Sequence, residues 1–319
     1  MTGGSGYVGR NLIRHFTDRG LEVVALVRSP RSAQVVTALG ATPFESDVLS
    51  PQLTEGMRGC DMLVHAAADT SHGSAHSSRQ RRINVEGTRN VFEAARRADI
   101  GKAVYISSES VLLDGGPLVN ATETHPHPKK PAGSYSRTKA EAEQAVLALA
   151  MPGFDAVVIR PRFVWGRDDT TALPQLVAAV HSGKFAWIDG GDYLTSTTHV
   201  ANLCHGVELA LLKGRSGEVY FITDGEPVPF RAIVGGLLQT QGIAAPNKSL
   251  PRSILRGMAA VGDFVERISL GRIKAPINRQ IFASSAVEIT LDIGKARTEL
   301  GYQPIMTMAE GLNELTHKT

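Results

Sequence analysis

The 319-residue sequence predicts a doubly wound α/β fold, in which helices cover both faces of a parallel sheet, with a smaller C-terminal lobe. Short β-branched runs alternate with amphipathic helical patterns over the first 160 residues, and a glycine-rich turn precedes the first helix. From about residue 165, Gly and Pro are more scattered and the strands are shorter. We therefore expect a first domain over 1–165, to which a strand and a helix return around 195–225. Residues 166–319 would form mainly a substrate-binding lobe.

The strands and helices of the first domain follow from periodicity. Val8, Leu12, Ile13 and Phe16 share one face of a helix that ends before Gly20. Two more amphipathic helices are predicted over 79–98 and 134–150. The apolar runs that predict strands are Glu22–Val27, Met62–Ala67, Ala103–Ser108, Ala156–Pro161 and, later in the chain, Glu218–Ile222.

A central strand of about five or six residues normally leads into such a glycine turn. Here the turn begins at Thr2. We expect either that the numbered chain begins late or that the sheet is built without this strand.

The glycine turn itself predicts a binding site for a dinucleotide. Glycines at positions 3, 6 and 9 let the backbone turn sharply and let a pyrophosphate approach the positive N-terminal end of the following helix. With the strands that follow, this is the pattern of a Rossmann-type dinucleotide-binding domain. The predicted contacts are Gly3, Ser5, Gly6, Tyr7, Val8 and Gly9.

The residue after the second strand favours NADP, although NAD is also possible. That strand ends in Val27-Arg28-Ser29, without the acidic residue that would bind the ribose hydroxyls of NAD. The Arg28 guanidinium suits a 2′-phosphate; the alternative is a solvated arginine at a strand end. Asp47 and Val48 are expected beside the adenine. The small residues Ala66, Ala67 and Ala68 would let the cofactor lie against the next strand.

Composition excludes several other classes of protein. The net charge is +3, with no like-charge run that would suggest nucleic-acid binding. The two cysteines, Cys60 and Cys204, indicate no disulfide scaffold and favour a reducing cytoplasm. No apolar stretch approaches the roughly 20 residues that span a bilayer, and no histidine or carboxylate cluster has metal-ligand spacing. We expect a soluble, cytoplasmic protein without a metal.

Tyr135 and Lys139 place a phenol and an ammonium on one face of the helix over 134–150. A tyrosine has a pKa near 10, so its use as a base near neutrality requires that a positive charge stabilise the phenolate. The strand 103–108 ends in hydroxyls at the sheet edge where ligands of such folds bind.

Together these motifs resemble the extended short-chain dehydrogenase/reductases, in their NAD-dependent epimerase/dehydratase and 3β-hydroxysteroid dehydrogenase branch. The similar segments are TGGSGYVG (2–9), HAAAD (65–69), NVEGT (84–88), SSESV (107–111), YSRTK (135–139), IRPRFVWG (159–166) and DIGKARTELGYQP (292–304). The resemblance implies that Ser108 binds the substrate oxygen, with Ser107 and Ser110 as alternatives. It implies that Tyr135 is the acid/base and that Lys139 holds the nicotinamide ribose. Asn84 would lie near the active site or serve structure alone, and the backbone at Pro161 would face the nicotinamide carboxamide.

The residues near 163 narrow the substrate class. Many sugar-nucleotide enzymes of this family carry asparagine where this chain has Phe163, and dehydratases carry an Asp-Glu pair where it has Glu109-Ser110. A hydrophobic pocket is therefore expected, lined by Phe163, Trp165, Trp187 and Tyr193. The apolar positions of the helical stretch 253–268 would be either lobe core or a wall or lid for a lipophilic substrate. His199 and Asn202 are expected to brace the lobe junction.

Three functions follow in order of preference. The first is an NAD(P)-dependent oxidoreductase that interconverts a secondary alcohol and a ketone on a hydrophobic, steroid-like or aryl substrate. The second is a sugar-nucleotide epimerase or dehydratase. The third is a protein that senses NADP without turnover, against which the presence of Tyr135 and Lys139 argues. The family resemblance also implies a homodimer through the helices near Arg79 and Tyr135.

Overall fold

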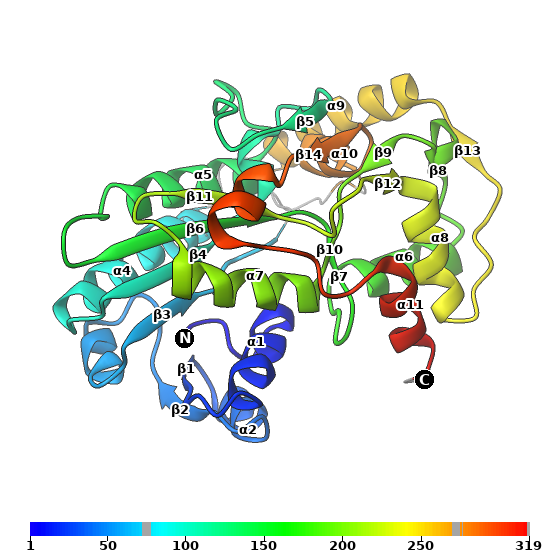
Figure 1. Cartoon of the computed structure of the whole chain (residues 1–319). Coiled ribbons are helices and arrows are strands. Elements are labelled where there is room, and N and C mark those ends of the chain that lie inside the picture. Colours follow the sequence, from blue (N-terminus) through cyan, green and yellow to red (C-terminus); the bar gives the residue numbers. More distant parts are fainter. Residues whose placement is uncertain (72–77, 270–274, 276, 318–319) are drawn as a thin grey trace.

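A parallel sheet forms the centre of the larger lobe (Figure 1). The computed structural model describes residues 1–319 except 72–77, 270–274, 276 and 318–319. Four of its strands lie in the order β11 (Val219–Ile222), β6 (Asp155–Pro161), β4 (Lys102–Ile106) and β3 (Met62–His65). A separate parallel pair, β1 (Val24–Val27) and β2 (Thr42–Glu45), lies beyond β3. The expected strands are present, with bounds that differ by at most two residues.

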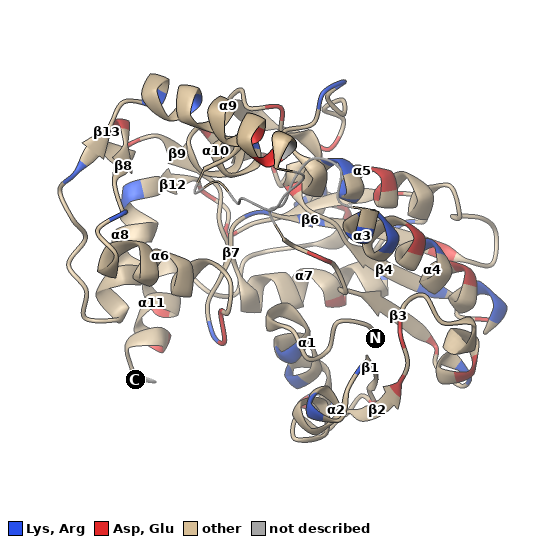
Figure 2. Cartoon of the chain, turned by 180° about the vertical axis from the view of Figure 1, so that it is seen from behind, with Lys and Arg blue, Asp and Glu red and all other residues tan. Residues whose placement is uncertain are grey.

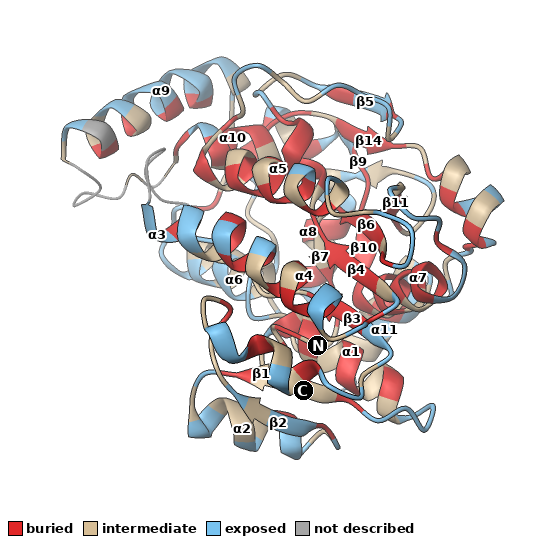
Figure 3. Ribbon diagram, turned by 90° about the vertical axis from the view of Figure 1, so that its left-hand side faces the viewer, coloured by how far each residue is buried: buried red, intermediate tan, exposed pale blue. Residues whose placement is uncertain are grey.

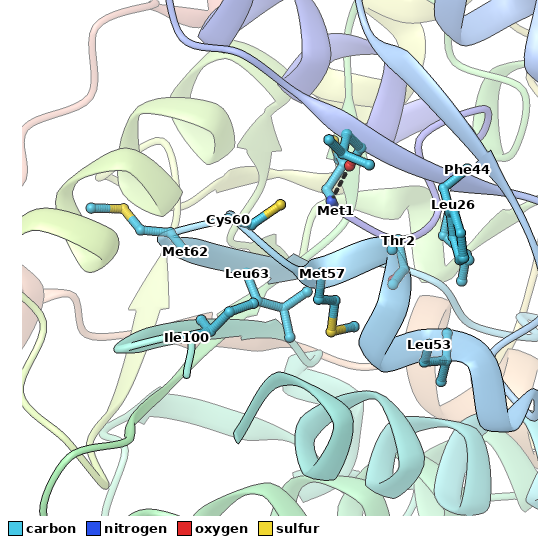
Figure 4. Close-up of a pocket in the computed structure, with 12 residues that line it drawn as sticks. Met1, Thr2, Leu26, Phe44, Leu53, Met57, Cys60, Met62, Leu63 and Ile100 are labelled. Carbon is cyan, nitrogen blue, oxygen red and sulfur yellow. Dashed lines mark hydrogen bonds between the residues drawn. The ribbon is translucent and has the colours of Figure 1, made fainter. Parts of the chain in front are cut away.

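Met1 and Thr2 join these two groups of strands. Thr2 forms parallel bridges to Leu26 on one side and His65 on the other, and the Thr2 N–H donates to the Val64 carbonyl at 3.0 Å. These two residues stand where a longer central strand was expected. Beside them, apolar side chains that include Leu26, Phe44 and Leu63 line a cavity of about 20 Å³ (Figure 4). Most of its lining residues are apolar, and Met62 among them is exposed.

Helices cover both faces of the sheet, which confirms the doubly wound α/β fold (Figure 1). One face carries α1 (Tyr7–Thr17) and α7 (Val200–Lys213), which pack against each other. The other carries α4 (Thr88–Arg97) and α5 (Ser134–Leu147). The shorter helical segments of this lobe are α2 (Pro30–Thr37), η1 (Pro51–Met57), α3 (Ser78–Arg81), the π-helical η2 (Arg82–Gly87), η3 (Glu109–Leu112) and η5 (Ala296–Leu300).

The smaller lobe combines a second sheet with helices. Its sheet has the order β12 (Val228–Pro229), β9 (Leu194–Thr195), β14 (Ile289–Leu291) and β5 (Leu118–Ala121). The strand β5 belongs to this sheet although it precedes the domain boundary predicted at residue 165. The chain therefore crosses between the lobes more often than that boundary suggests. The other elements are α6 (Ala172–His181), α8 (Phe230–Thr240), α9 (Arg252–Ile268), α10 (Arg279–Ser285), α11 (Met308–Thr316), η4 (Asp189–Gly191) and the pairs β7 (Val164–Trp165) with β10 (Thr198–His199) and β8 (Trp187–Ile188) with β13 (Ser249–Leu250).

The junction of the lobes is built around one carboxylate. Asp224 accepts hydrogen bonds from the Trp165 indole at 2.8 Å, the Thr197 hydroxyl at 2.7 Å and the Asn202 amide at 2.7 Å. Asn202 also accepts from the Ile305 and Met306 N–H groups, so it ties α7 to the C-terminal segment. These contacts hold the small lobe at the carboxyl edge of the large sheet.

Candidate active site and cofactor cradle

The glycine turn brings the backbone of residues 3–9 against the end of β3. Gly3 has φ +73°, and a Cβ there would lie 2.7 Å from the Ala67 nitrogen. A Cβ on Gly9 would lie 2.0 Å from the Gly3 carbonyl oxygen, so neither position tolerates a side chain. Gly6 precedes α1 as its N-cap, is exposed and makes no side-chain cap. No side chain of the N-cap residue therefore satisfies the first N–H groups of α1, which fits a pyrophosphate at this helix end.

Buried hydrogen bonds fix the segment that faces this turn. The Thr2 hydroxyl lies 2.6 Å from His65 Nδ1 and accepts from the Ala67 N–H at 3.2 Å. His65 Nε2 contacts the Thr88 hydroxyl at 2.9 Å. Burial, with the nearby Lys139 charge, lowers the pKa of His65 to about 3, so its ring is neutral. The small residues Ala66, Ala67 and Ala68 are thus held half-exposed beside the glycine turn.

The predicted adenosine contacts lie at the carboxyl ends of adjacent strands. Arg28 follows β1 and Asp47 follows β2, and their charged groups are 4.0 Å apart with both side chains largely exposed. Val48 is buried, and a Cβ on Gly87 would lie 2.7 Å from it. Ser29 caps α2 by accepting from the Ser32 N–H. The structure thus places Arg28 beside a helix N-terminus at an accessible edge.

Ser108 and Tyr135 meet at the carboxyl edge of the sheet. Their side chains are hydrogen-bonded, although one follows β4 and the other begins α5. Burial raises the pKa of Tyr135 well above its usual value, the nearby Glu109 charge raises it further, and the Ser108 hydrogen bond opposes both. The phenol is therefore a proton donor at neutral pH in this state.

Lys139 lies one helical turn beyond Tyr135 and is almost fully buried. Its ammonium donates to the Ile106 carbonyl at 2.6 Å and lies 4.2 Å from the centre of the Tyr105 ring. Burial lowers the pKa of Lys139 to about 7, while the charge of Glu143 opposes this effect. The amine thus reaches the end of β4, between the sheet and α5.

Asn84 uses its whole amide group in contacts within the protein. Its oxygen accepts from the Asp69 N–H at 2.7 Å, and its nitrogen donates to the Asp69 carbonyl and to the Thr138 hydroxyl, both at 3.1 Å. Asn84 therefore clamps the loop after β3 to the helix that carries Tyr135 and Lys139. None of these three bonds joins it to Tyr135 or Lys139 directly.

Two neighbouring serines are each held by a buried glutamate–arginine pair. The Ser108 hydroxyl donates to Glu109 at 2.8 Å, and Glu109 pairs with Arg162 at 2.7 Å. One residue earlier, Ser107 donates to Glu143 at 2.7 Å, and Glu143 pairs with Arg160. The two arginines stand two residues apart, on and just after β6.

These glutamates and arginines were not predicted as site residues from the sequence. Charged side chains within an otherwise apolar strand are almost never buried unless they are paired. The segment Ile159-Arg160-Pro161-Arg162 therefore contained a signal for two buried acidic partners, but it did not say which ones. Pro161 itself ends β6 and is buried between the two arginines in the chain.

The predicted pocket residues divide into two groups. Trp165 and Trp187 are fully buried in the small-lobe core, where their indole N–H groups donate to Asp224 and to the Pro246 carbonyl. Phe163 and Tyr193 are half-exposed and are joined by a third ring, Phe230. Phe230 meets Phe163 edge-to-face at 6.2 Å between centroids and stacks on Tyr193 at 5.3 Å. Phe230 was not predicted as a pocket residue from the sequence.

The comparisons with known proteins decide the family. Residues 1–252 match the sequence model of the 3-beta hydroxysteroid dehydrogenase/isomerase family. The chain belongs to this family. Family members depend on a nicotinamide dinucleotide, and the protein is an oxidoreductase that acts on hydroxyl or keto groups.

Two curated relatives and one solved structure illustrate the match. The chain is 49% identical over 316 residues to a 4-hydroxy-2-methyl-3-oxo-4-farnesyl-3,4-dihydroquinoline-1-oxide ketoreductase of Stigmatella aurantiaca, covering 99% of this chain and 94% of the relative. It is 31% identical to the decarboxylating sterol-4-alpha-carboxylate 3-dehydrogenase of Dictyostelium discoideum, covering 99% and 98%. A dTDP-glucose 4,6-dehydratase of Streptomyces venezuelae with NAD bound shares the fold, with a TM-score of 0.77, 23% identity and 99% and 94% coverage.

Two further findings concern the described residues as a whole. Among them, no helix is both long and apolar enough to cross a membrane. Within the same part of the chain, no three His, Cys, Asp or Glu side chains form a group that could hold a metal ion.

Proposed function

We propose that this protein is an NADP-preferring ketoreductase or alcohol dehydrogenase whose substrate is hydrophobic and polycyclic or aryl. The observation that carries the proposal is the hydrogen-bonded pair of Ser108 and Tyr135 at the sheet edge. Glu109 and Arg162 connect this pair to the segment that begins a row of aromatic rings at Phe163. A dinucleotide bound at the glycine turn would supply or accept the hydride. Residues 1–165 would mainly bind this cofactor, and residues 166–319 would mainly bind the substrate.

In the reductive direction, Tyr135 donates its phenolic proton to the substrate carbonyl oxygen while hydride adds to the carbonyl carbon. The product is a secondary alcohol, which balances the reaction. Ser108 would bind the same oxygen by turning its hydroxyl hydrogen toward it from Glu109, which accepts that hydrogen in this structure and is itself held by Arg162. The raised pKa of Tyr135 supports this direction, since the phenol then carries the proton to be transferred.

The cofactor cradle supports the proposed dinucleotide. Gly3, Ser5, Gly6 and Gly9 form the turn, and the N–H groups of Tyr7 and Val8 begin α1. Ala66, Ala67, Ala68, Asp47 and Val48 would line the adenosine side, and Lys139 the nicotinamide ribose. Pro161 would bring backbone to the carboxamide. The exposed Arg28 guanidinium supports NADP over NAD, because it can pair with a 2′-phosphate.

The aromatic row supports the hydrophobic substrate class. Phe163, Phe230 and Tyr193 offer half-exposed rings, and the Stigmatella relative is named for a farnesylated quinoline substrate. The Glu109 carboxylate accepts from Ser108 and forms an ion pair with Arg162. Because these contacts favour the ionised carboxylate, they argue against a role for Glu109 as the acid of a sugar dehydratase. A cytoplasmic location and a homodimer through α3, η2, α4 and α5 complete the proposal.

The test is NADPH or NADH absorbance in the presence of quinolone, steroid and other aryl ketones. We expect turnover with NADPH and an apolar ketone. The alternative sugar-nucleotide enzyme would instead be stabilised against heat by UDP- or dTDP-sugars and would not oxidise NADPH with these ketones. Binding of NADPH without turnover of any ketone or alcohol would favour a cofactor sensor.

A further inference from the structure

The helix that carries Tyr135 begins without a cap from the residue before it. α5 starts at Ser134, and its N-cap residue is Gly133, which has no side chain to accept from the first N–H groups of the helix. Ser, Thr, Asp or Asn is preferred at this position, and loss of such a cap costs about 1 kcal/mol. Tyr135 lies in this first turn, so its position depends on what else holds the turn.

A glutamine from the small lobe supplies the acceptor. The Gln280 Oε1 accepts from the Ser136 N–H at 3.2 Å, and Gln280 is buried. A Cβ on Gly133 would lie 2.7 Å from the same oxygen and 2.8 Å from the Gln280 Cβ. Gly133 therefore leaves room for Gln280, which caps α5 from a position 144 residues further along the chain. Figure 3 shows its helix, α10, beside α5.

The helix α10 is held in place by its own cap and by packing. Asn278 caps it by accepting from the Ile281 N–H at 3.0 Å, and Phe282 is buried. Arg279, by contrast, is exposed; it is the one charged residue of this helix, and charged residues are coloured in Figure 2. The packing of α10 therefore determines where the amide of Gln280 lies.

The same helix is bonded to two further parts of the candidate site. Its Ser284 carbonyl accepts from Arg162 at 3.0 Å, and its Ser285 carbonyl accepts from the Tyr193 hydroxyl. Arg162 belongs to the buried ion pair behind Ser108, and Tyr193 belongs to the aromatic row. The helix α10 therefore joins both of these parts to the first turn of α5.

We propose that Gln280 positions Tyr135 for proton transfer and that the small lobe thereby sets the geometry of the reaction. Gln280 acts through the Ser136 N–H and the backbone of α5, so it is a positioning residue and not a catalytic one. Misplacement of a reacting group by about 1 Å can slow a reaction about a hundredfold, so a looser first turn lowers the rate even in a folded protein. A cap that served stability alone would lower Tm and leave the kcat of the folded protein unchanged. The inference rests on the proposed function, because it concerns turnover of a ketone.

The test compares ketone reduction by the parent, Gln280→Met and Gln280→Glu at a temperature where circular dichroism shows each to be folded. Gln280→Met keeps the length of the side chain but removes the acceptor, so kcat should fall about tenfold while the Kd for NADPH stays within about twofold. Gln280→Glu restores an acceptor at a helix N-terminus and should recover at least about half of the parent kcat. The matched control, Arg279→Gln on the same helix, should keep the parent kcat and KM.

Amide hydrogen exchange measures the anchoring of α5 without substrate or cofactor. Exchange in a peptide that covers residues 133–140 should be about fivefold faster in Gln280→Met than in the parent, because a cap of about 1 kcal/mol is lost. Peptides from α1 should be unchanged. Gln280→Asn, which withdraws the acceptor oxygen by one methylene, replaces Gln280→Met if that variant does not fold, and should give the same losses.

The outcomes separate this proposal from the proposed function. An unchanged kcat in Gln280→Met, the same loss in Arg279→Gln, or no recovery in Gln280→Glu would overturn the role of Gln280. So would unchanged exchange at the start of α5. A parent that reduces no ketone would contradict the proposed function, whereas the exchange result would still decide whether Gln280 holds α5.

Discussion

The Arg162 guanidinium and the Glu109 carboxylate form a buried ion pair, 2.7 Å apart, directly behind the Ser108 hydroxyl. Arg162 is further held by the Thr195 hydroxyl, at 3.1 Å from its Nε and 2.9 Å from its NH2, and by the small-lobe Ser284. The pair therefore connects the small lobe to the serine that contacts Tyr135. It places a negative charge near a phenol that must exchange a proton.

Neutralising this carboxylate should change the pH dependence of the reaction. The groups that act on Tyr135 are Glu109, whose charge raises the phenol pKa, and Ser108, whose hydrogen bond lowers it. Glu109→Gln should thus lower the Tyr135 pKa, so ketone reduction should decline at a lower pH than in the parent. The measurement is kcat/KM for reduction across pH. Glu123→Gln, at a carboxylate that accepts from Phe221, is the control and should keep the parent profile.

The same substitution should also cost stability. Removing one partner of a buried pair leaves Arg162 poorly compensated, so the free energy of unfolding should fall by about 3 to 5 kcal/mol. Urea denaturation measures this. A variant as stable as the parent would show that the pair is more solvated than its burial indicates.

Tyr135→Phe removes the acidic proton and keeps the ring. We expect kcat to fall about a hundredfold or more, while the affinity for NADPH stays near the parent value. Single-turnover kinetics and fluorescence titration of NADPH separate these effects. Retention of most of the turnover would remove Tyr135 from the mechanism.

Phe163 tests the substrate class. Its backbone has φ +40°, a left-handed conformation that asparagine adopts more readily than phenylalanine, so Phe163→Asn should not strain the backbone. We expect KM for hydrophobic ketones to rise, because up to roughly 1.5 to 3 kcal/mol of apolar contact is lost. The affinity for the cofactor should stay constant. A large fall in Tm with unchanged KM would mean that the ring serves the small-lobe core instead.

Arg28→Asp tests the choice of dinucleotide. Reversal of this charge should weaken NADPH binding at least tenfold by removing a charge-assisted contact and adding repulsion to the 2′-phosphate. NADH binding should change little. Arg58→Asp, at another exposed arginine, is the control for net charge. Equal affinity of the parent for both cofactors would contradict the assignment of Arg28.

Glu143 should make stability depend on acid pH. Burial alone would raise its pKa, but hydrogen bonds from His127, Arg160 and Ser107 lower it to about 2. Its contribution is therefore complete above the unfolded pKa of about 4.5 and is lost as pH falls toward about 2. This contribution is about 3 kcal/mol. Denaturation midpoints of the parent and Glu143→Gln should converge as pH falls through this range, and parallel curves would contradict the prediction.

Local pattern was sufficient to predict the α/β fold and most of its strands. The alternation of β-branched runs with amphipathic helices depends on neighbouring residues, and it located β4, β6 and α5 to within a few residues. The glycine spacing predicted the turn before α1 in the same way, because the need for absent side chains is local to the backbone. The motifs around Ser108 and Tyr135 sufficed to recognise the family, which the comparison confirms.

Only the tertiary structure decided which distant groups meet. Glu109 and Arg162 are 53 residues apart, and no periodicity within either segment specifies their pairing. Trp165 and Trp187 were predicted to line the pocket, but both are buried in the small-lobe core. The sequence alone does not separate these two roles, because a large aromatic residue fits a core and a pocket equally well. The helix α9 is amphipathic in sequence whether its apolar residues face the lobe or solvent. Packing of Leu255, Ala259 and Gly262 against the following chain decides this, and leaves the larger apolar side chains exposed.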